Sequence, residues 1–61
     1  MKLDYNTKEK INQLLESEAI NYLETSERLI LKNMLEKDNH SELEIQNITK
    51  IILKYSKFIK N

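Results

Sequence analysis

The residues that come nearest to a catalytic pair in this chain are His40 and Ser41, which follow each other in a short polar segment. A histidine can activate a serine hydroxyl as a nucleophile when the two side chains form a hydrogen bond. Adjacent residues at a helix start rarely point at each other, and Ser41 has a competing role, because Glu44 follows it at the spacing of a capping box. We therefore expect His40 to be an exposed turn residue, predict no catalytic residue and expect no enzyme activity.

Metal and cofactor chemistry has little more to use. The 61-residue chain contains one histidine, no cysteine and no glycine, so it lacks the usual ligand set of a zinc site and a glycine-rich phosphate loop. Glu24 and Glu27 share a helix face at i,i+3, but two carboxylates near a helix start are also what the helix dipole favours. We predict neither a metal site nor a cofactor.

Charge is distributed unevenly, although the formal net charge is zero. Residues 16–27 contain four acidic side chains and no basic one, whereas residues 45–61 contain four lysines and no acidic side chain. On a continuous helix Lys50, Lys54 and Lys57 would follow the i, i+4, i+7 rule and form one basic strip. The strip could contact phosphates or an acidic partner, or it could simply cover the solvated face of a helix.

Leu53 lies beside these lysines and, like Leu43, falls off the apolar stripe of its helix. An exposed leucine flanked by lysines suits an anchor for a protein partner, although single exposed leucines are common without any role. The candidate partner-binding residues are Lys50, Leu53, Lys54, Lys57, Glu16, Glu18, Glu24 and Glu27.

Three helices are predicted to position these side chains, over about residues 7–18, 26–37 and 42–60. Without glycine or proline, the boundaries must come from capping residues, and we expect Asn6 with Glu9, then Thr25 or Ser26, and finally Ser41 with Glu44. The third helix has the clearest signal, because large apolar residues recur there at three- and four-residue spacing. They are Ile45, Ile48, Ile51, Ile52, Tyr55, Phe58 and Ile59.

The predicted fold is a single all-α domain over residues 1–61, a small three-helix bundle. The polar turn at 37–40 is short enough to make the last two helices an antiparallel hairpin. Leu29 lies nearly opposite the Ile30–Leu35 face, so the second helix is expected between the other two. The main alternative is one helix from Thr7 to Lys37, which the polar cluster at 24–26 disfavours.

Two segments together resemble the small helical-hairpin modules of bacteriophage and mobile-element accessory proteins. They are Leu23–Met34, with a leucine, a Ser/Thr cap and a glutamate before apolar residues, and Ser41–Tyr55, with Ser-Glu, apolar residues every three or four positions and a final Lys-Tyr. The resemblance covers about half of the chain and departs from the pattern at Ser26, where an aromatic residue is usual. It implies an accessory binding role and supplies no catalytic residues.

The favoured function is therefore a phage- or mobile-element-type regulator that docks on a host macromolecular complex and blocks or tunes it. A nucleic-acid-binding module that uses the lysine strip and a self-associating hairpin with the third helix as dimer seam are the alternatives. No segment is long and apolar enough to span a bilayer, and the polar start does not resemble a signal peptide. We expect a cytoplasmic protein with a protein partner, possible nucleic-acid contact and no membrane contact.

Overall fold

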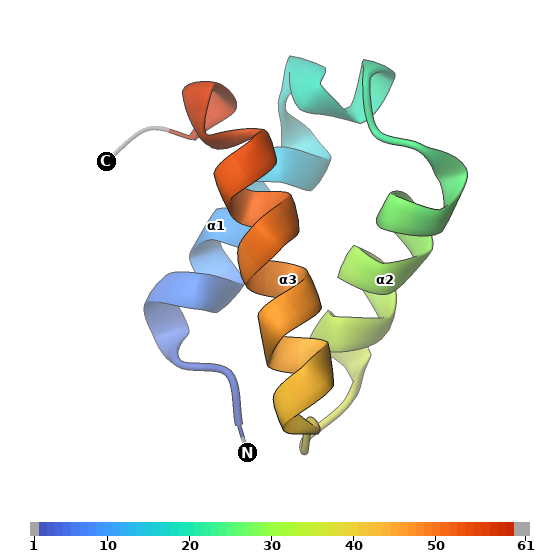
Figure 1. Cartoon of the computed structure of the whole chain (residues 1–61). Coiled ribbons are helices and arrows are strands. Elements are labelled where there is room, and N and C mark those ends of the chain that lie inside the picture. Colours follow the sequence, from blue (N-terminus) through green and yellow to red (C-terminus); the bar gives the residue numbers. More distant parts are fainter. Residues whose placement is uncertain (1, 60–61) are drawn as a thin grey trace.

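A computed structural model describes residues 2–59, which form three α-helices: α1 (Tyr5–Glu16), α2 (Thr25–Glu36) and α3 (Glu42–Lys54). Two short 3-10 helices, η1 (Glu18–Asn21) and η2 (Ser56–Phe58), follow α1 and α3. α1 and α3 run in the same direction, and α2 runs in the opposite one (Figure 1). The predicted all-α three-helix bundle and its antiparallel α2–α3 hairpin are confirmed.

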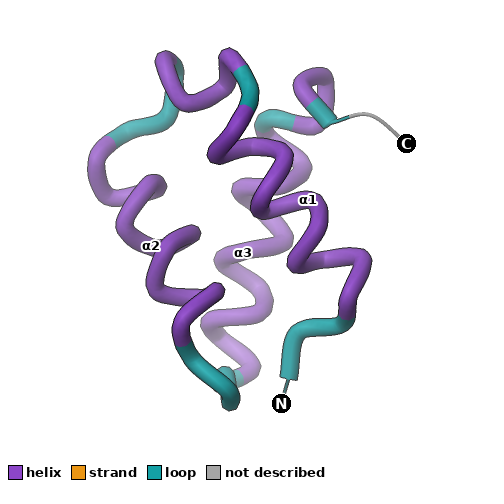
Figure 2. The backbone as a smooth tube through the Cα atoms, turned by 180° about the vertical axis from the view of Figure 1, so that it is seen from behind, coloured by secondary structure: helices purple, strands orange, loops and turns teal. Residues whose placement is uncertain are grey.

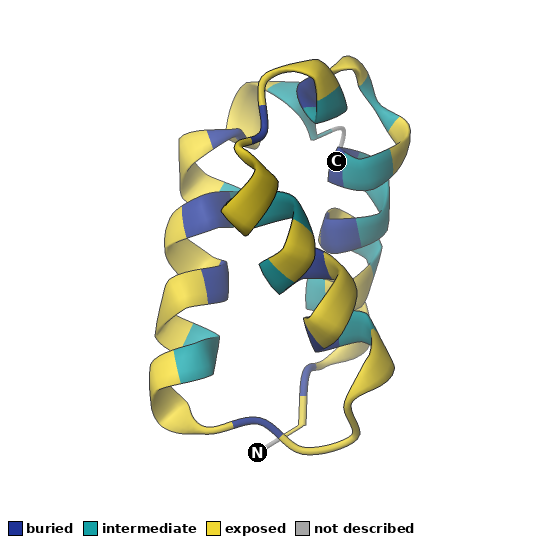
Figure 3. Ribbon diagram, turned by 90° about the vertical axis from the view of Figure 1, so that its right-hand side faces the viewer, coloured by how far each residue is buried: buried dark blue, intermediate teal, exposed yellow. Residues whose placement is uncertain are grey.

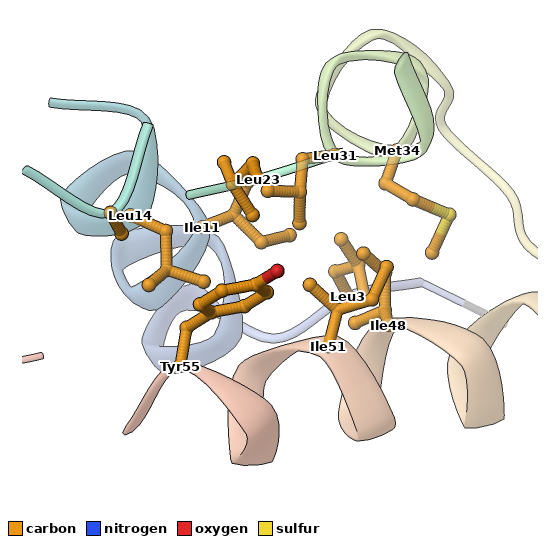
Figure 4. Packing of buried hydrophobic residues seen from close by; sticks show 10 residues of the cluster. Leu3, Ile11, Leu14, Leu23, Leu31, Met34, Ile48, Ile51 and Tyr55 are labelled. Atoms are coloured by element: carbon orange, nitrogen blue, oxygen red, sulfur yellow. The ribbon is translucent and has the colours of Figure 1, made fainter. Parts of the chain in front are cut away.

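Each helix contributes apolar side chains to one shared core (Figures 3 and 4). Ile11, Leu14, Leu31 and Ile48 are fully buried, and Met34 is 2% exposed. Because a small domain gains most of its stability from such burial, these five side chains hold the helices together. The rest of the core consists of Leu3, Ala19, Leu23, Ile51 and Tyr55.

α3 begins as predicted, with a reciprocal cap. The Ser41 hydroxyl oxygen accepts the backbone N–H of Glu44 at 3.1 Å, and the Glu44 carboxylate accepts the backbone N–H of Ser41 at 2.9 Å. The two bonds satisfy N–H groups that have no partner within the helix. The capping box at Ser41 and Glu44 is therefore confirmed.

The starts of α1 and α2 differ from the prediction. α1 begins at Tyr5 with Asp4 as its cap, because an Asp4 carboxylate oxygen accepts the backbone N–H of Thr7 at 2.7 Å. The expected cap at Asn6 is wrong, since Asn6 lies inside the first turn. At α2 the capping residue is Glu24 rather than Thr25 or Ser26.

The continuous helix from residue 7 to 37 is excluded, because the chain leaves the α-helical conformation at Ser17. Ser17 has φ −99° and ψ 179°, its hydroxyl oxygen accepts the N–H of Ala19 at 3.1 Å, and the hydroxyl donates to the carbonyl of Leu14 at 3.2 Å. The break thus begins earlier than the cluster at 24–26 suggested, and α1 ends at Glu16 instead of residue 18.

α3 is shorter than predicted, ending at Lys54 rather than near residue 60. Tyr55, at φ −111° and ψ 23°, leaves the helix and places its hydroxyl 3.2 Å from the carbonyl oxygen of Tyr22. Phe58 in η2 then stacks on the Tyr22 ring with centroids 5.6 Å apart. These contacts join η1 to η2 across the end of the bundle and accompany the end of the helix. Lys60 lies outside the described residues.

α2 is not sandwiched between the other helices, since α1 and α3 also contact each other. In the rear view α1 and α2 lie on either side with α3 behind them (Figure 2), and all three helices contribute residues to the core. Leu29, on the outer side of α2, is accordingly 55% exposed. None of the helices within residues 2–59 is long and apolar enough to cross a bilayer.

The side chains near the N-terminus separate into buried and exposed ones. Leu3 joins the core, whereas Tyr5 and Tyr22 are mostly exposed. Although its ring is mostly exposed, Tyr22 contacts the end of the hairpin in two ways, because its ring stacks on Phe58 and its carbonyl oxygen accepts the Tyr55 hydroxyl. Met1 lies outside the described residues.

Candidate partner-binding surface

The acidic segment and the lysines, far apart in the sequence, meet at one end of the bundle. Glu16 ends α1, Glu18 opens η1 and Glu24 caps α2. The C-terminal end of α3, with Lys54, lies at this same end (Figure 1). The two charged segments therefore do not form two independent binding surfaces.

Glu27 is the point at which they are joined. Its carboxylate accepts hydrogen bonds from the Tyr55 hydroxyl at 2.5 Å, from the backbone N–H of Glu24 at 2.9 Å and from the Lys54 ammonium group at 3.0 Å. The Lys54 nitrogen also lies 3.9 Å from a Glu24 carboxylate oxygen. Since Glu27 and Glu24 come from the start of α2 and Lys54 and Tyr55 from the end of α3, the cluster fastens the open end of the hairpin.

The hydrogen bonds shift the ionisation of the three groups. Partial burial raises the pKa of Glu27, but the bonds from Tyr55, Glu24 and Lys54 outweigh it and lower the pKa overall. The hydrogen bond to Glu27 raises the pKa of Lys54, and the same partner, together with burial, raises the pKa of Tyr55. All three shifts favour an anionic Glu27 with a cationic Lys54 and a neutral Tyr55.

This cluster changes the roles predicted for two of the candidate residues. The Glu27 side chain is only 13% exposed, so it contributes little negative surface to a partner. Lys54 already has a carboxylate partner within the chain, and moving it to an external phosphate would break that contact. Glu16, Glu18 and Glu24 are exposed and keep their place as candidates.

The basic strip is not continuous. Lys50 and Lys54 lie on α3, but Lys57 follows the end of that helix and belongs to η2, where its ammonium group lies 5.3 Å from the centre of the Phe58 ring. The predicted i, i+4, i+7 arrangement over Lys50, Lys54 and Lys57 is therefore wrong at its last position. Lys50 is exposed on the outer face of α3 and forms no salt bridge among the described residues.

Leu53 is placed as the sequence predicted. Its side chain is 68% exposed, and Leu43 is 66% exposed. Leu53 borders a shallow depression of about 200 Å³, together with Lys10 of α1 and with Ile52, Ser56 and Ile59. A depression with an apolar floor beside an exposed leucine can receive an apolar side chain of a partner.

Lys10 and Ile59 were not among the predicted site residues, because their position beside Leu53 depends on the packing of α1 against α3. The sequence signal for this side of α3 is the seven-residue spacing of Ile45 and Ile52, which places them on one face of the helix. In the structure both side chains are half-buried and pack at the margin of the core. Such residues mark the boundary between core and surface.

His40 is buried, at 4% exposure, which makes the expectation of an exposed turn residue wrong. Its Nε2 atom lies 2.8 Å from the carbonyl oxygen of Met34, in the last turn of α2. The geometry requires Nε2 to carry the proton and to donate to that oxygen, whose helical partner is missing at the helix end. His40 therefore closes the C-terminal end of α2, and the hydroxyl of Ser41 caps α3.

The remaining chemistry of the described residues is limited. Between residues 2 and 59 no three His, Asp or Glu side chains lie close enough together to hold a metal ion. A further ion pair, Lys37 with Glu44 at 2.6 Å, joins the end of α2 to the start of α3. This pair connects two helices of the fold, whereas the Leu53 depression combines an exposed apolar side chain with an apolar floor and is the main candidate site.

Comparison with known proteins adds no further constraint. No protein-family model matches the chain, and neither a curated protein nor a solved structure matches it.

Proposed function

We propose that this protein is a small non-enzymatic interaction module that binds a protein partner through the outer face of α3 around Leu53. The observation that supports this most strongly is the exposure of Leu53, a large apolar side chain held on a helix and beside an apolar depression. A rigid apolar anchor near a pocket is the kind of feature on which binding energy concentrates at protein interfaces.

The proposed role of that binding is regulation by occlusion. In the form implied by the resemblance to phage and mobile-element modules, the protein would dock on a host nucleic-acid-processing or defence complex in the cytoplasm. Exposed Glu16 and Glu18 near the opposite end of the bundle from the N-terminus could add contacts to a basic groove. Glu27 would act only within the fold.

Nucleic-acid binding through the lysines is the weaker proposal. Lys54 is paired with Glu27, and Lys57 departs from the line of α3. The joint variant Lys50→Gln/Lys57→Gln spares the Glu27 contact and tests this function. Steeply salt-dependent binding of DNA or RNA that this variant loses would favour it over protein binding.

Self-association through the apolar face of α3 would require free energy to expose residues that are buried within the chain. Ile48, Ile51 and Tyr55 are buried against the other helices of the same chain. A dimer formed through these residues would require α3 to leave the bundle. Such a dimer predicts a melting temperature that rises with protein concentration.

Photo-crosslinking tests the proposed function. Leu53 is replaced by benzoylphenylalanine, and Leu29, also exposed but on α2, carries the same replacement in the control. We expect a discrete protein adduct in bacterial extract from position 53 and none from position 29. Equal adducts from both positions, or no adduct from position 53, would contradict a protein-binding role for this face.

A further inference from the structure

The Leu53 depression is one of two depressions that lie between α3 and the segment that contains α1. A second depression, of about 230 Å³, is bordered by Lys2 and Thr7 on one side and by Ile45 and Thr49 on the other. Thr49 precedes Ile52 and Leu53 by three and four residues, so the two depressions follow each other along one face of the helix without sharing a lining residue. Together they form a groove between the parallel helices α1 and α3, here called the α1–α3 groove.

The groove combines an apolar floor with a basic rim. Ile45, Ile52 and Ile59 are half-buried in it, which leaves apolar area open to solvent. Lys2 and Lys10 are exposed along the α1 side. Lys50, exposed one turn before Leu53 on α3, lies outside the lining of both depressions and adds positive charge beyond Leu53.

Negative charge in the groove comes from a single side chain of the described lining. Among the described residues that line the two depressions, Asp4 is the one carboxylate. It accepts the backbone N–H of Thr7 as the cap of α1, and its hydrogen bonds with Thr7 lower its pKa. Asp4 stays anionic and exposed, so the described lining sets one carboxylate against the ammonium groups of Lys2 and Lys10 and leaves the apolar floor uncovered.

The groove on the other side of α3 is less suited to an apolar ligand. It is bordered by Asn33 and Asn47 together with Ile30, Met34 and Glu44. Glu44 is held there by its ion pair with Lys37. Docking on this side would require desolvation of two amides and of an ion pair, which costs free energy unless the partner replaces every hydrogen bond.

We propose that the α1–α3 groove binds an acidic amphipathic helix of a protein partner. The inference rests on the proposed function and specifies the partner. Two adjacent helices form a groove into which the ridge of a third helix fits. The length of α3, about 20 Å for thirteen residues, matches three to four turns of such a ligand.

The chemistry of the complex follows from the arrangement of floor and rim. Apolar residues of the ligand at i, i+4 and i+7 cover Ile45, Ile52 and Leu53, and its carboxylates reach Lys2, Lys10 and Lys50. A nucleic acid fits less well, because phosphates would satisfy the lysines and leave the isoleucine floor uncovered. The described lining also offers no aromatic ring on which a base could stack.

The test selects ligands without assuming a natural partner. A phage-displayed library of random 18-residue peptides is panned against the whole chain, and the enriched peptides are synthesised with a fluorescent label. Affinity is measured by fluorescence anisotropy, and the binding site is mapped by methyl NMR. We expect enriched peptides with a net negative charge, an amphipathic helical pattern and chemical-shift changes centred on Ile45, Ile52 and Leu53.

Matched variants make the result specific. Leu53→Asp should weaken binding by about tenfold or more, and Leu29→Asp should leave it unchanged, since both leucines are exposed and neither change should unfold the chain. Lys10→Glu/Lys50→Glu should weaken binding of the acidic peptides. Circular dichroism checks that each variant keeps its helices.

Several outcomes would overturn the inference. They are enrichment of neutral or basic peptides, shift changes at Asn33 and Asn47 instead of the α1–α3 groove, tighter binding of duplex DNA than of any peptide, and a dimer of this chain that Leu53→Asp dissolves. If crosslinking at position 53 yields a protein but the groove selects no acidic helix, the proposed function stands and this inference fails. If position 53 yields no protein, both fail.

Discussion

Glu27 is the residue whose role changes most between sequence and structure. The sequence places it among acidic surface residues, whereas the structure gives its carboxylate three donors: the Tyr55 hydroxyl, the Lys54 ammonium group and the backbone N–H of Glu24. The Tyr55 contact is partly buried, so loss of the carboxylate acceptor is costly there, whereas the Lys54 and Glu24 donors are exposed and can bind water instead. Glu27 should therefore matter for stability rather than for partner recognition.

Glu27→Gln should lower the free energy of unfolding by about 1–3 kcal/mol at neutral pH. Because the pKa of Glu27 is lower in the folded than in the unfolded chain, its charge stabilises the fold above the ordinary value of 4.5, and this stabilisation is lost as the pH falls through the lower folded value. Urea titrations between neutral and acidic pH should show a flatter acid limb for the variant.

Two further variants serve as controls for this prediction. Glu24→Gln should cost less than about 0.5 kcal/mol, because its side chain is 69% exposed and 3.9 Å from Lys54. Tyr55→Phe removes the hydroxyl donor, and its effect should be smaller in the Glu27→Gln background than in the wild type. Additive effects of the two changes would contradict a direct Tyr55–Glu27 bond.

Glu44 offers a second prediction at the scale of single residues. The hydrogen bond from Lys37 and then the backbone N–H of Ser41 lower the pKa of Glu44 to about 2. Lys37→Gln removes the first cause and leaves the second, so NMR titration should show a higher pKa that stays below the ordinary 4.5. An unchanged pKa in the variant would show that the Lys37–Glu44 pair does not persist in solution.

At the scale of elements, the residues of α3 that face the core differ slightly from those that the sequence indicated. The sequence put Ile52 in the core, but Ile52 is half-buried at the α1–α3 groove and Ile48 is fully buried. The face toward the core follows Ile48, Ile51 and Tyr55, at i, i+3 and i+7. Both interpretations fit the same apolar period, because the helix is apolar over a broad arc.

Ile48→Ala should therefore cost about 2–5 kcal/mol through the cavity it leaves. Ile52→Ala should cost clearly less, because the groove already exposes part of its side chain. Chemical denaturation measures the free energy of unfolding of both variants. Low temperature is used because the loss in Ile48→Ala can approach the whole stability of so small a chain. Equal losses for the two variants would mean that Ile52 is as deeply packed as Ile48.

The sequence predicted features that depend on neighbouring residues better than features that depend on distant contacts. The Ser41–Glu44 cap depends on residues three apart, so the sequence alone was sufficient to locate it. The end of α3 depends on Tyr55 and Phe58 meeting Tyr22, more than thirty residues away. His40 was missed for the same reason, because its burial follows from the approach of the loop to the last turn of α2.

At the scale of the whole molecule, the acidic and basic segments are separate in the sequence but lie together in the fold. Folding brings the acidic and basic segments to one end of the bundle and pairs part of each with the other, which reduces the charge available for recognition. The sequence located Leu53 as an exposed leucine. The groove beside it could not be predicted, because it requires Lys2 and Lys10 to lie across from α3.

Partner binding as proposed requires that the core stripe of α3 is internal while Leu53 and the groove remain open to solvent. Methyl NMR with a soluble paramagnetic agent measures both at once. We expect strong relaxation enhancement at Leu53, intermediate values at Ile45 and Ile52, and almost none at Ile48. Enhancement at Ile48 equal to that at Leu53, or protection of Leu53 in the isolated monomer, would contradict this requirement.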